Sequence, residues 1–450
     1  MLISKVQWKD HPILGNLLLD FSMPSGGAYK TVVLAGENGT GKSSVLDTLS
    51  QFLNLGPITP FERIEYLVGG QLYKATPPTG WTTHPNFFER HDPDGEVVRI
   101  HADRNNNPAT IDSDERDPRQ SGCVYSKARS EYKTQKIKAT SASALDVLKR
   151  DIDENDDFTS LKQLIVDVSN RDNAEYADTN RVLGDKPKSW AEFYLTSKLY
   201  RFKESFNQFF DALKFESVVD ENEEKTIRFT KGGASIPIDS LSTGEKQIVF
   251  RGAHLLRNSG VLHGGAIFVD EPELSMHPKW QRKILAYYKG LFTVDANQIA
   301  QLFFATHSDH VVKAALKDDQ TIVITLERGE QGLIAKRHDA ASVLPMITSA
   351  EANYRAFDLP SIDYHIELYG WLQEKESKLS VKSCDEFIAA HPLFNPAIHG
   401  RHSAFKATTY TTLSTLVRNA IHHPAQGTDF TEDELRTSIR LLTDILRHEP

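Results

Sequence analysis

The chain has little cysteine, no long apolar run and no excess of positive charge in its 450 residues. Cys123 and Cys384 lie far apart and outside any CxxC pattern, so the sequence supports neither a disulfide framework nor a zinc hook. No apolar stretch approaches the ~20 residues that cross a bilayer as a helix. The formal net charge of −9 gives no overall basic field for nucleic acid, although a local basic stripe could still bind it.

The first residues, Met1–Gly15, lack the apolar core and the small-residue cleavage site of a secretory signal peptide. With only two cysteines, this favours a reducing compartment, and we expect a cytoplasmic protein. Hydrophobic residues make up 39% of the chain and charged residues 25%, which is typical of a soluble globular protein with a sizeable core.

A phosphate-binding loop is predicted near the N-terminus. The β-branched strand Lys30–Leu34 leads into GENGTGKSS (36–44), which fits G-x4-G-K-S between a strand and a helix. Glycines let the backbone curl around phosphates, Lys42 reaches the β and γ oxygens, and the Ser43 hydroxyl ligates Mg²⁺. The predicted nucleotide-binding residues of this loop are Asn38, Gly39, Thr40, Gly41, Lys42, Ser43 and Ser44.

Two later strands are predicted to end in catalytic side chains. In Gly265–Glu273, four apolar residues precede Asp270 and Glu271, which can support a metal and orient the attacking water. The apolar strand within Leu302–Ser308 ends at His307, a group suited to the γ-phosphate and to the water. An acidic strand end or a strand-end histidine is common as plain structure, but both follow a phosphate loop here.

A short turn, Leu241–Gln247, opens an apolar helix. Ser242, Gly244 and Glu245 suit an anion site, because free N–H groups and the positive end of the helix dipole point outward at a helix start. The same residues also fit an ordinary helix cap, in which Glu245 completes a capping box.

The remaining pattern predicts the framework of the fold. Residues 61–120 indicate an antiparallel meander, and Thr321–Leu326 with Gly332–Arg337 a hairpin that closes the sheet. The predicted strand pair is Leu2–Trp8 with Leu17–Phe21, and the predicted helical segments are Leu145–Ile152, Leu161–Val168, Phe193–Leu213, Ile248–Leu256, Tyr364–Gln373, Ser383–Ala390, Tyr410–His422 and Leu435–Arg447, with Asp151–Asp157 and Asn170–Asn180 as polar connectors.

A basic stripe runs through Val124–Lys138. Such a stripe could hold a nucleic-acid backbone, but we favour a solvated strand face. Its cations are Lys127, Arg129, Lys133, Lys136 and Lys138.

A second motif lies in LVRNAIHHP (416–424), where His423 stands five positions after Arg418. This spacing resembles the R-x4-6-H motif of HEPN ribonucleases, whose arginine stabilises a phosphate and whose histidine assists attack by the 2′-hydroxyl. The alternative, which we favour, is a structural helix end or a docking element: basic residues suit the dipole at a helix C-terminus, and Pro424 stops the helix.

Four segments in fixed order carry a wider resemblance: GENGTGKSS, LSTGEKQ, AIFVDEPELSMHP and FFATHSDH. Together they resemble the ABC-type ATPase head of SMC-like and OLD-like proteins, with Walker A, signature, Walker B plus D-loop, and H-loop motifs. The resemblance implies an α/β P-loop NTPase fold, a mixed sheet with an antiparallel β subdomain. The implied parts are an N-terminal lobe (1–138), a helical insertion (139–215), a C-terminal lobe (216–345) and a helical partner or oligomer region (346–450).

The resemblance also implies roles for site residues. ATP and Mg²⁺ are the cofactors, Asp270 and Ser43 hold the metal, Glu271 is the catalytic base and His307 is the switch histidine. Ser275–His277 lie in the D-loop, and Gln71 and Gln120 are the candidates for a Q-loop glutamine.

The signature has a special role in this family, because the signature of one protomer closes over the Walker A nucleotide of another. Ser242, Gly244 and Glu245 would therefore serve a neighbour's ATP in a head-to-head dimer or a higher homo-oligomer.

The chain departs from better-known relatives. It has no membrane domain and no long coiled coil, and Thr321–Arg328 holds one Glu without the Asp-x-Asp of a Toprim nuclease. It therefore resembles antiphage ATPases whose nuclease is a separate chain. The stronger resemblance is to the PtuA ATPases of Septu systems, which partner an HNH nuclease (PtuB); second are the AriA ATPases of PARIS systems, which partner a Toprim nuclease.

We expect an ATP-binding and ATP-hydrolysing sensor and scaffold that controls a separately encoded nuclease, of the HNH rather than the Toprim type. Two alternatives stay open. One is a self-contained ribonuclease that uses Arg418 and His423 under ATPase control. The other is a DNA-repair or recombination ATPase that holds duplex DNA through the stripe at 125–138.

Overall fold

The computed structural model describes residues 1–79, 87–101, 111, 113–129, 132–141, 143–152, 158–184, 187–195, 197–221, 223–330, 332–338, 342–405, 408–424 and 429–448. The chain divides into two compact units, Met1–Arg337 and His338–Pro450. The second unit begins at His338, whereas the sequence predicts a boundary at 346.

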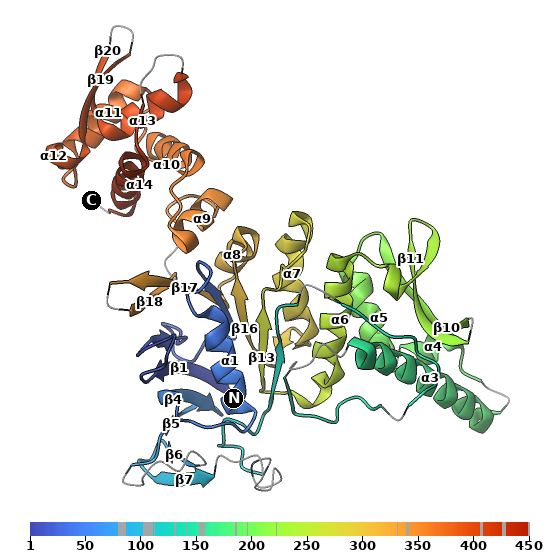
Figure 1. Ribbon diagram of the computed structural model, residues 1–450. Helices are drawn as coiled ribbons and strands as arrows, with labels where there is room; N and C mark the ends of the chain where they lie inside the picture. Colours follow the sequence, from blue (N-terminus) through green and yellow to red (C-terminus); the bar gives the residue numbers. More distant parts are fainter. Residues whose placement is uncertain are drawn as a thin grey trace. The chain divides into compact units, whose positions relative to one another are not determined.

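A seven-stranded sheet forms the centre of Met1–Arg337 (Figure 1), in the order β18-β17-β3-β16-β13-β8-β9. All neighbouring pairs are parallel except β17 and β18, the predicted closing hairpin. The carboxyl ends of the parallel strands therefore meet at one edge, where open α/β sheets place their ligands. The strands are β3 (Thr31–Ala35), β8 (Cys123–Ser126), β9 (Arg150–Ile152), β13 (Ala266–Asp270), β16 (Gln301–Thr306), β17 (Thr321–Gly329) and β18 (Gly332–Arg337).

A second, antiparallel sheet has six strands in the order β2-β1-β4-β5-β6-β7. It confirms the predicted N-terminal strand pair and, for the described residues, the meander. Its buried side chains share one apolar core with helix α1 (Lys42–Leu53) and with the central sheet, including Trp8, Phe52 and Phe303. The strands are β1 (Leu2–Trp8), β2 (Leu18–Asp20), β4 (Phe61–Val68), β5 (Gln71–Thr76), β6 (Phe87–His91) and β7 (Val97–His101).

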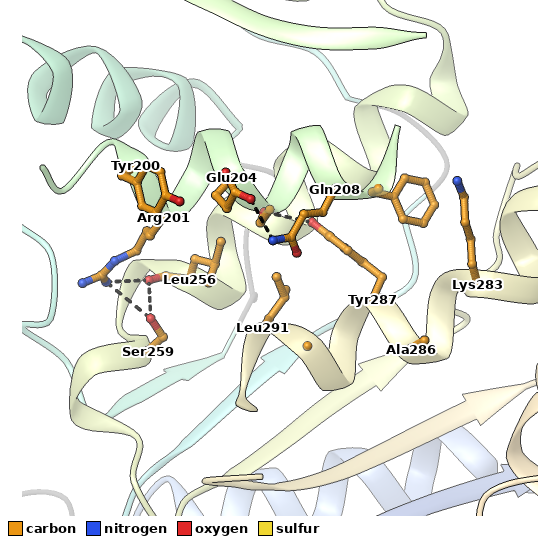
Figure 2. A pocket seen from close by; sticks show the side chains of 13 residues that line it. Tyr200, Arg201, Glu204, Gln208, Leu256, Ser259, Lys283, Ala286, Tyr287 and Leu291 are labelled. Carbon is orange, nitrogen blue, oxygen red and sulfur yellow. Dashed lines mark hydrogen bonds between the residues drawn. The ribbon is translucent and has the colours of Figure 1, made fainter. Parts of the chain in front are cut away.

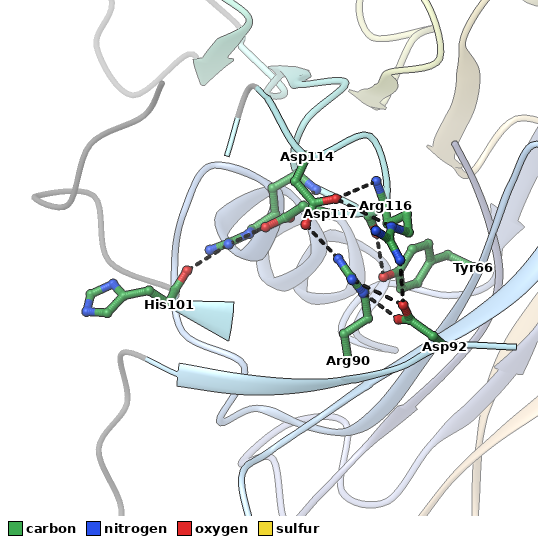
Figure 3. A network of polar contacts seen from close by, with 8 residues as sticks. Tyr66, Arg90, Asp92, His101, Asp114, Arg116 and Asp117 are labelled. Carbon is green, nitrogen blue, oxygen red and sulfur yellow. Dashed lines mark hydrogen bonds and ion pairs between the residues drawn. The ribbon is translucent and has the colours of Figure 1, made fainter. Parts of the chain in front are cut away.

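An ion-pair network fastens the segment before β8 to this antiparallel sheet (Figure 3). Arg90 on β6 donates to Asp92 and to Asp114, each at 2.6 Å, and Arg119 donates to Asp117 at 2.6 Å. The side chains of Arg90, Asp92, Arg119 and Asp117 are at most 3% exposed. Because each buried charge has a close partner, the network fixes the path of the chain into the central sheet.

The helical part of this unit corrects two predictions. Leu145–Ile152 is not a helix: Arg150–Ile152 forms β9, because its backbone pairs with β8 at the sheet edge, while Val147 is 65% exposed. Asn170–Asn180 is not a connector either, since it lies inside the long helix α3 (Phe158–Leu183). Its polar composition suits the solvated second half of that helix. The predicted connector at Asp151–Asp157 lies largely outside the described residues.

The other elements of Met1–Arg337 follow in chain order. Phe193–Leu213 contains two short helices rather than one, and the predicted helix at Ile248–Leu256 is confirmed within α6. The elements are α4 (Trp190–Tyr194), α5 (Tyr200–Phe209), β10 (Leu213–Glu221), β11 (Glu224–Lys231), β12 (Ala234–Pro237), η1 (Ile238–Ser240), α6 (Thr243–Arg257), η2 (Ser259–Val261), α7 (Pro278–Leu291), β14 (Thr293–Val294), β15 (Asn297–Gln298) and α8 (Asp309–Leu316).

The unit His338–Pro450 is mainly helical but also contains a β-hairpin that the sequence pattern did not predict. The predicted helix at Tyr410–His422 begins only at Leu413, because Tyr410 pairs in strand β20 and the Thr412 side chain caps the helix. The capping box at Thr431 and Glu434 is confirmed. The elements are α9 (Ser349–Phe357), α10 (Ile362–Lys375), α11 (Val381–Ala390), α12 (Pro396–His399), β19 (Gly400–Phe405), β20 (Thr408–Thr412), α13 (Leu413–His422) and α14 (Glu432–Arg447).

In the described part of the chain, every helix is too short or too polar to cross a membrane.

Candidate functional site

The phosphate loop leaves the carboxyl end of β3 and enters α1. Gly36, Gly39 and Gly41 have φ values of +138°, +77° and +84°, which favour glycine and let the loop curl. The Lys42 ammonium donates to the carbonyls of Gly36 and Glu37, both at 2.8 Å. Burial lowers the pKa of Lys42 to about 8, although the carboxylates of Asp270, Glu271 and Glu273 act in the opposite direction. A desolvated lysine in a loop of free amides is suited to a phosphate group.

Strand β13, which is separated from β3 by β16, ends in the predicted metal ligand and the predicted base. Ser43 forms a side-chain hydrogen bond with Asp270. Burial raises the pKa of Asp270, although this bond acts in the opposite direction. Glu271 follows directly and has φ of +44°, in the left-handed region that a non-glycine residue rarely occupies. Such local strain is often found where a side chain must be aimed for function.

The histidine of the next strand completes the group. His307 follows β16, and its Nε2 lies 3.3 Å from Oε1 of Glu271. Its Nδ1 lies 3.0 Å from the carbonyl oxygen of Gly36 and 3.3 Å from Nζ of Lys42. The structure therefore brings Lys42, Ser43, Asp270, Glu271 and His307 together at one sheet edge.

Glu273 belongs to this edge, although the sequence analysis gave it no role. Its Oε1 accepts hydrogen bonds from the Thr306 hydroxyl at 2.7 Å, the His307 amide at 2.8 Å and the Ser308 amide at 3.1 Å. The Glu273 side chain comes from the turn after β13 and is hydrogen-bonded to the end of β16 and to the turn that follows it. The sequence shows a carboxylate two residues after Glu271, but the hydrogen bonds of Glu273 depend on the pairing of β13 with β16.

Arg251 is a second residue that the sequence analysis missed. It lies on α6, is 2% exposed and donates to the carbonyls of Glu271 at 2.9 Å, Asp270 at 2.7 Å and Lys127 at 2.6 Å. The helix that begins at the signature is thereby bonded to the backbone of the catalytic strand end. A buried arginine in an apolar helix was the available signal.

The signature turn has the geometry of a capped helix start. The Ser242 side chain accepts from the Glu245 amide, and the Glu245 carboxylate accepts from Ser242 and from Lys231, the latter at 2.7 Å. Ser242 and Thr243 are exposed. A Cβ on Gly244 would come within 2.7 Å of the Ser275 carbonyl oxygen, so this glycine allows close contact with the D-loop of the same chain. A role toward a neighbour's nucleotide stays a prediction.

The two Q-loop candidates do not lie at this edge. Gln71 opens β5 of the antiparallel sheet, and Gln120 precedes β8 at its amino end. At the carboxyl end of β8, the described chain carries Ser126, whose buried hydroxyl has no hydrogen-bond partner there. The topology therefore brings neither candidate to the edge that carries the phosphate loop.

The basic stripe is not a continuous strand face. Among the residues of the stripe that the structure describes, the strand is Cys123–Ser126, and it is buried in the central sheet. Lys127 forms an ion pair with Asp47 at 3.5 Å, and Lys136 with Glu224 at 3.0 Å. Tertiary contacts with α6, not solvent, decide the path of the following segment.

The histidine motif of the second unit lies at the end of α13. Arg418 donates to the Asn419 side chain at 3.0 Å, and the His423 amide donates to the Asn419 carbonyl at 2.9 Å. His422 is exposed, and its pKa is lowered by partial burial and then by the charges of Arg418 and His423. The motif thus has the helix-end position that the structural alternative predicted.

A separate cavity of about 530 Å³ opens between α5 and α7 (Figure 2). Arg201 and Lys283 lie toward its opposite ends, and Leu256, Leu291 and Tyr287 form apolar parts of its wall. None of its lining residues belongs to the phosphate loop, the signature turn or the ends of β13 and β16.

A P-loop after one parallel strand, an acidic pair after the second and a histidine after the third fit a P-loop NTPase fold. The sequence pattern of one known family matches residues 32–313, more than half of the chain; it is described as "AAA domain, putative AbiEii toxin, Type IV TA system". The chain belongs to this family. No curated protein matches it in sequence.

Three solved SMC heads are similar in structure. An SmcHead bound to the C-winged helix domain of ScpA is 14% identical with a TM-score of 0.40, over 75% of this chain and 98% of that one. An Smc head with an extended coiled coil, bound to the C-terminal domain of ScpA from Pyrococcus furiosus, is 14% identical with a TM-score of 0.38, over 75% and 96%. The SMC head from Thermotoga maritima is 13% identical with a TM-score of 0.36, over 76% and 100%.

Proposed function

We propose that the chain binds ATP and hydrolyses it at the edge formed by β3, β13 and β16. Lys42 and the loop amides bind the β- and γ-phosphates, Glu271 takes a proton from the attacking water, and His307 holds the geometry of that water. The observation that carries this proposal is the contact of His307 with Glu271 on one side and with the phosphate loop on the other.

The residues at this edge also fit Mg²⁺. The Ser43 hydroxyl and the Asp270 carboxylate form an adjacent pair of oxygen donors, and Mg²⁺ in nucleotide sites uses one or two protein ligands besides phosphates and water. The metal would neutralise charge on the phosphate oxygens. Removing it with a chelator is expected to abolish turnover.

The site is proposed to be completed by a second copy of the chain. Ser242, Gly244 and Glu245 of one protomer would cover the nucleotide held by the phosphate loop of the other. Supporting this, Ser242 and Thr243 are exposed at the start of α6, where helix amides and the helix dipole suit a phosphate. A head-to-head dimer or a higher homo-oligomer follows.

The biological role we propose is a sensor and scaffold in antiphage defence, most like the Septu ATPases. Nucleotide state would set the arrangement of the heads and thereby hold or release a separately encoded nuclease, of the HNH type in preference to Toprim. The matching family is described in terms of a toxin of a toxin–antitoxin system, and an ATPase that controls a harmful nuclease suits that description.

The test has two parts. Purified chain is assayed for phosphate release from ATP, with and without Mg²⁺, and then co-expressed with the product of the adjacent gene. Metal-dependent turnover and co-purification of an HNH protein, whose cleavage of DNA responds to ATP, are expected. An ATPase without a nuclease neighbour contradicts the scaffold role, and a Toprim neighbour moves the chain to the PARIS type.

A second candidate function is ribonuclease activity of the chain itself. The observation in its favour is that Arg418 and His423 both lie at the end of α13, where burial and then their charges lower the pKa of the adjacent His422. Cleavage of tRNA by the purified chain that is lost in Arg418→Ala would establish this function and remove the need for a nuclease partner.

The DNA-repair alternative has less support. Two lysines of the stripe at 125–138 form ion pairs with Asp47 and Glu224 of the same chain. Strong, salt-dependent binding of duplex DNA that is lost on neutralising Lys133 and Lys136 would revive it.

A further inference from the structure

Glu273 is the most heavily bonded carboxylate at the catalytic edge. Three donors converge on its Oε1: the Thr306 hydroxyl and the amides of His307 and Ser308. Its residue is 8% exposed, and no protein donor reaches its Oε2 within the described chain. Burial of a carboxylate is costly, and this one is bonded through a single oxygen.

The donors are the last residue of β16, Thr306, and the two residues of the turn that follows it, His307 and Ser308. This turn would otherwise be held at its start by β16 and at its end by α8, whose first amides are capped by the Ser308 side chain. Ser308 also donates from its hydroxyl to Gln281 on α7 at 2.7 Å. The ring of His307 contacts Glu271 and the phosphate loop, and Glu273 binds the backbone amide of the same residue, between these two anchors.

We infer that Glu273 is a positioning residue, which holds the backbone of His307 so that the imidazole stays between Glu271 and the phosphate loop. This inference rests on the proposed ATP hydrolysis and adds a residue to it. Glu273 touches no reacting atom in the proposed site and acts through His307. It also ties the turn after β13 to the turn after β16, so that the base and the histidine move together.

A charged acceptor is needed for this task. A carboxylate oxygen carries more charge than an amide oxygen, and hydrogen bonds to an ionised acceptor are roughly twice as strong as neutral ones. Three donors on one neutral amide oxygen would be poorly satisfied. Glu273→Gln therefore keeps the volume of the side chain but weakens its hydrogen bonds to the turn. It tests the carboxylate charge more specifically than a substitution that removes the side chain.

The experiment is a double-mutant cycle between Glu273→Gln and His307→Ala, with ATP turnover and ATP affinity measured for each variant. Glu273→Gln alone is expected to lower kcat by about tenfold or more while changing ATP affinity less than about threefold. In the His307→Ala background the same substitution is expected to change kcat less than about twofold. Glu204→Gln is the matched control, because Glu204 accepts a bond only from Gln208 among the described residues and lies at the α5–α7 cavity.

Two results would overturn the inference. Equal losses from Glu273→Gln in the two backgrounds would mean that Glu273 does not act through His307. A Glu273→Gln protein with full turnover would mean that the carboxylate charge is not needed.

A second readout separates this inference from the proposed function. Amide hydrogen exchange at His307 and Ser308 is expected to be faster by tenfold or more in Glu273→Gln and unchanged in Glu204→Gln, whether or not the chain hydrolyses ATP. If the wild-type protein shows no turnover, the proposed function fails while the exchange result still decides the role of Glu273. Unchanged hydrogen exchange at both amides would contradict the positioning role of Glu273.

Discussion

Buried polar groups are arranged differently at the sheet edge of Met1–Arg337 and in the core of His338–Pro450. At the sheet edge, three carboxylates (Asp270, Glu271 and Glu273) lie near two cations (Lys42 and Arg251), so negative charge exceeds positive charge. In the second unit the buried carboxylate of Asp385 accepts four hydrogen bonds, from the amides and hydroxyls of Thr411 and Thr412, at 2.7 to 3.1 Å.

Other buried polar groups of the second unit are paired, as Glu351 is with Arg355 at 3.4 Å, or are neutral. His365 is fully buried, its Nε2 lies 2.9 Å from the Ser438 hydroxyl, and that hydroxyl donates to Ser414 at 2.7 Å. Burial lowers the pKa of His365 to about 3, so the ring is uncharged at neutral pH. Groups that satisfy one another in this way stabilise a core, whereas an excess of buried charge calls for a charged ligand. This difference in buried charge distinguishes a ligand site from a structural core without reference to any sequence motif.

The largest effect that would test this contrast is expected for Glu271→Gln. If the carboxylate acts as the base, turnover should fall by about 10²- to 10⁴-fold, because general base catalysis contributes that range. ATP affinity should change little, since Lys42 and the loop amides remain. Phosphate release and binding of a fluorescent ATP analogue measure the two quantities. Full turnover in this variant would mean that Glu271 is not the catalytic base.

The matching test in the second unit is Asp385→Ala. Loss of the carboxylate leaves donors of the buried Thr412 and of the exposed Thr411 without their acceptor, and we expect the free energy of unfolding of this unit to fall by about 3 kcal/mol. ATP turnover at 25 °C should stay within about twofold of wild type. Calorimetry and the turnover assay check both parts, with the exposed Asp363→Ala as control. A stable variant without turnover would mean that the two units are not divided as we describe.

The same contrast explains what the sequence could predict. The phosphate loop, the acidic pair and His307 were found because each is a contiguous motif at a strand end. Glu273 and Arg251 were missed because their partners are distant in sequence: Arg251 binds the carbonyl of Lys127, 124 residues away. Arg150–Ile152 was mistaken for helix because pairing with β8 overrides local periodicity.

The predicted contact between protomers can be tested at Thr243. Gly244 is a poor choice, because a side chain there would meet the Ser275 carbonyl of its own chain. Thr243 is exposed at the first position of α6, where an acidic residue suits the helix dipole. Thr243→Glu should therefore fold well but repel a neighbour's phosphates.

In a Glu271→Gln background, ATP-dependent dimer formation is expected to weaken by tenfold or more in Thr243→Glu and by less than threefold in Thr243→Gln, which has the same size without the charge. Light scattering after size exclusion measures the dimer. Equal dimer formation by the two variants would show that no phosphate approaches this helix start.

The smallest expected effect concerns Lys42 and pH. Burial lowers its pKa to about 8, from an ordinary value near 10.5, so the ligand-free lysine loses its proton as the pH rises through 8. Bound phosphates favour the charged form and should restore a higher pKa. ATP affinity is therefore expected to be constant below pH 7.5 and to fall by up to about tenfold per pH unit above 8, with uptake of one proton on binding. Calorimetry in two buffers of different ionisation enthalpy measures this uptake, and Lys42→Met should show none. An affinity that stays flat to pH 9.5 would mean that the carboxylates around Lys42 outweigh its burial, and that the edge already holds its lysine charged before the nucleotide arrives.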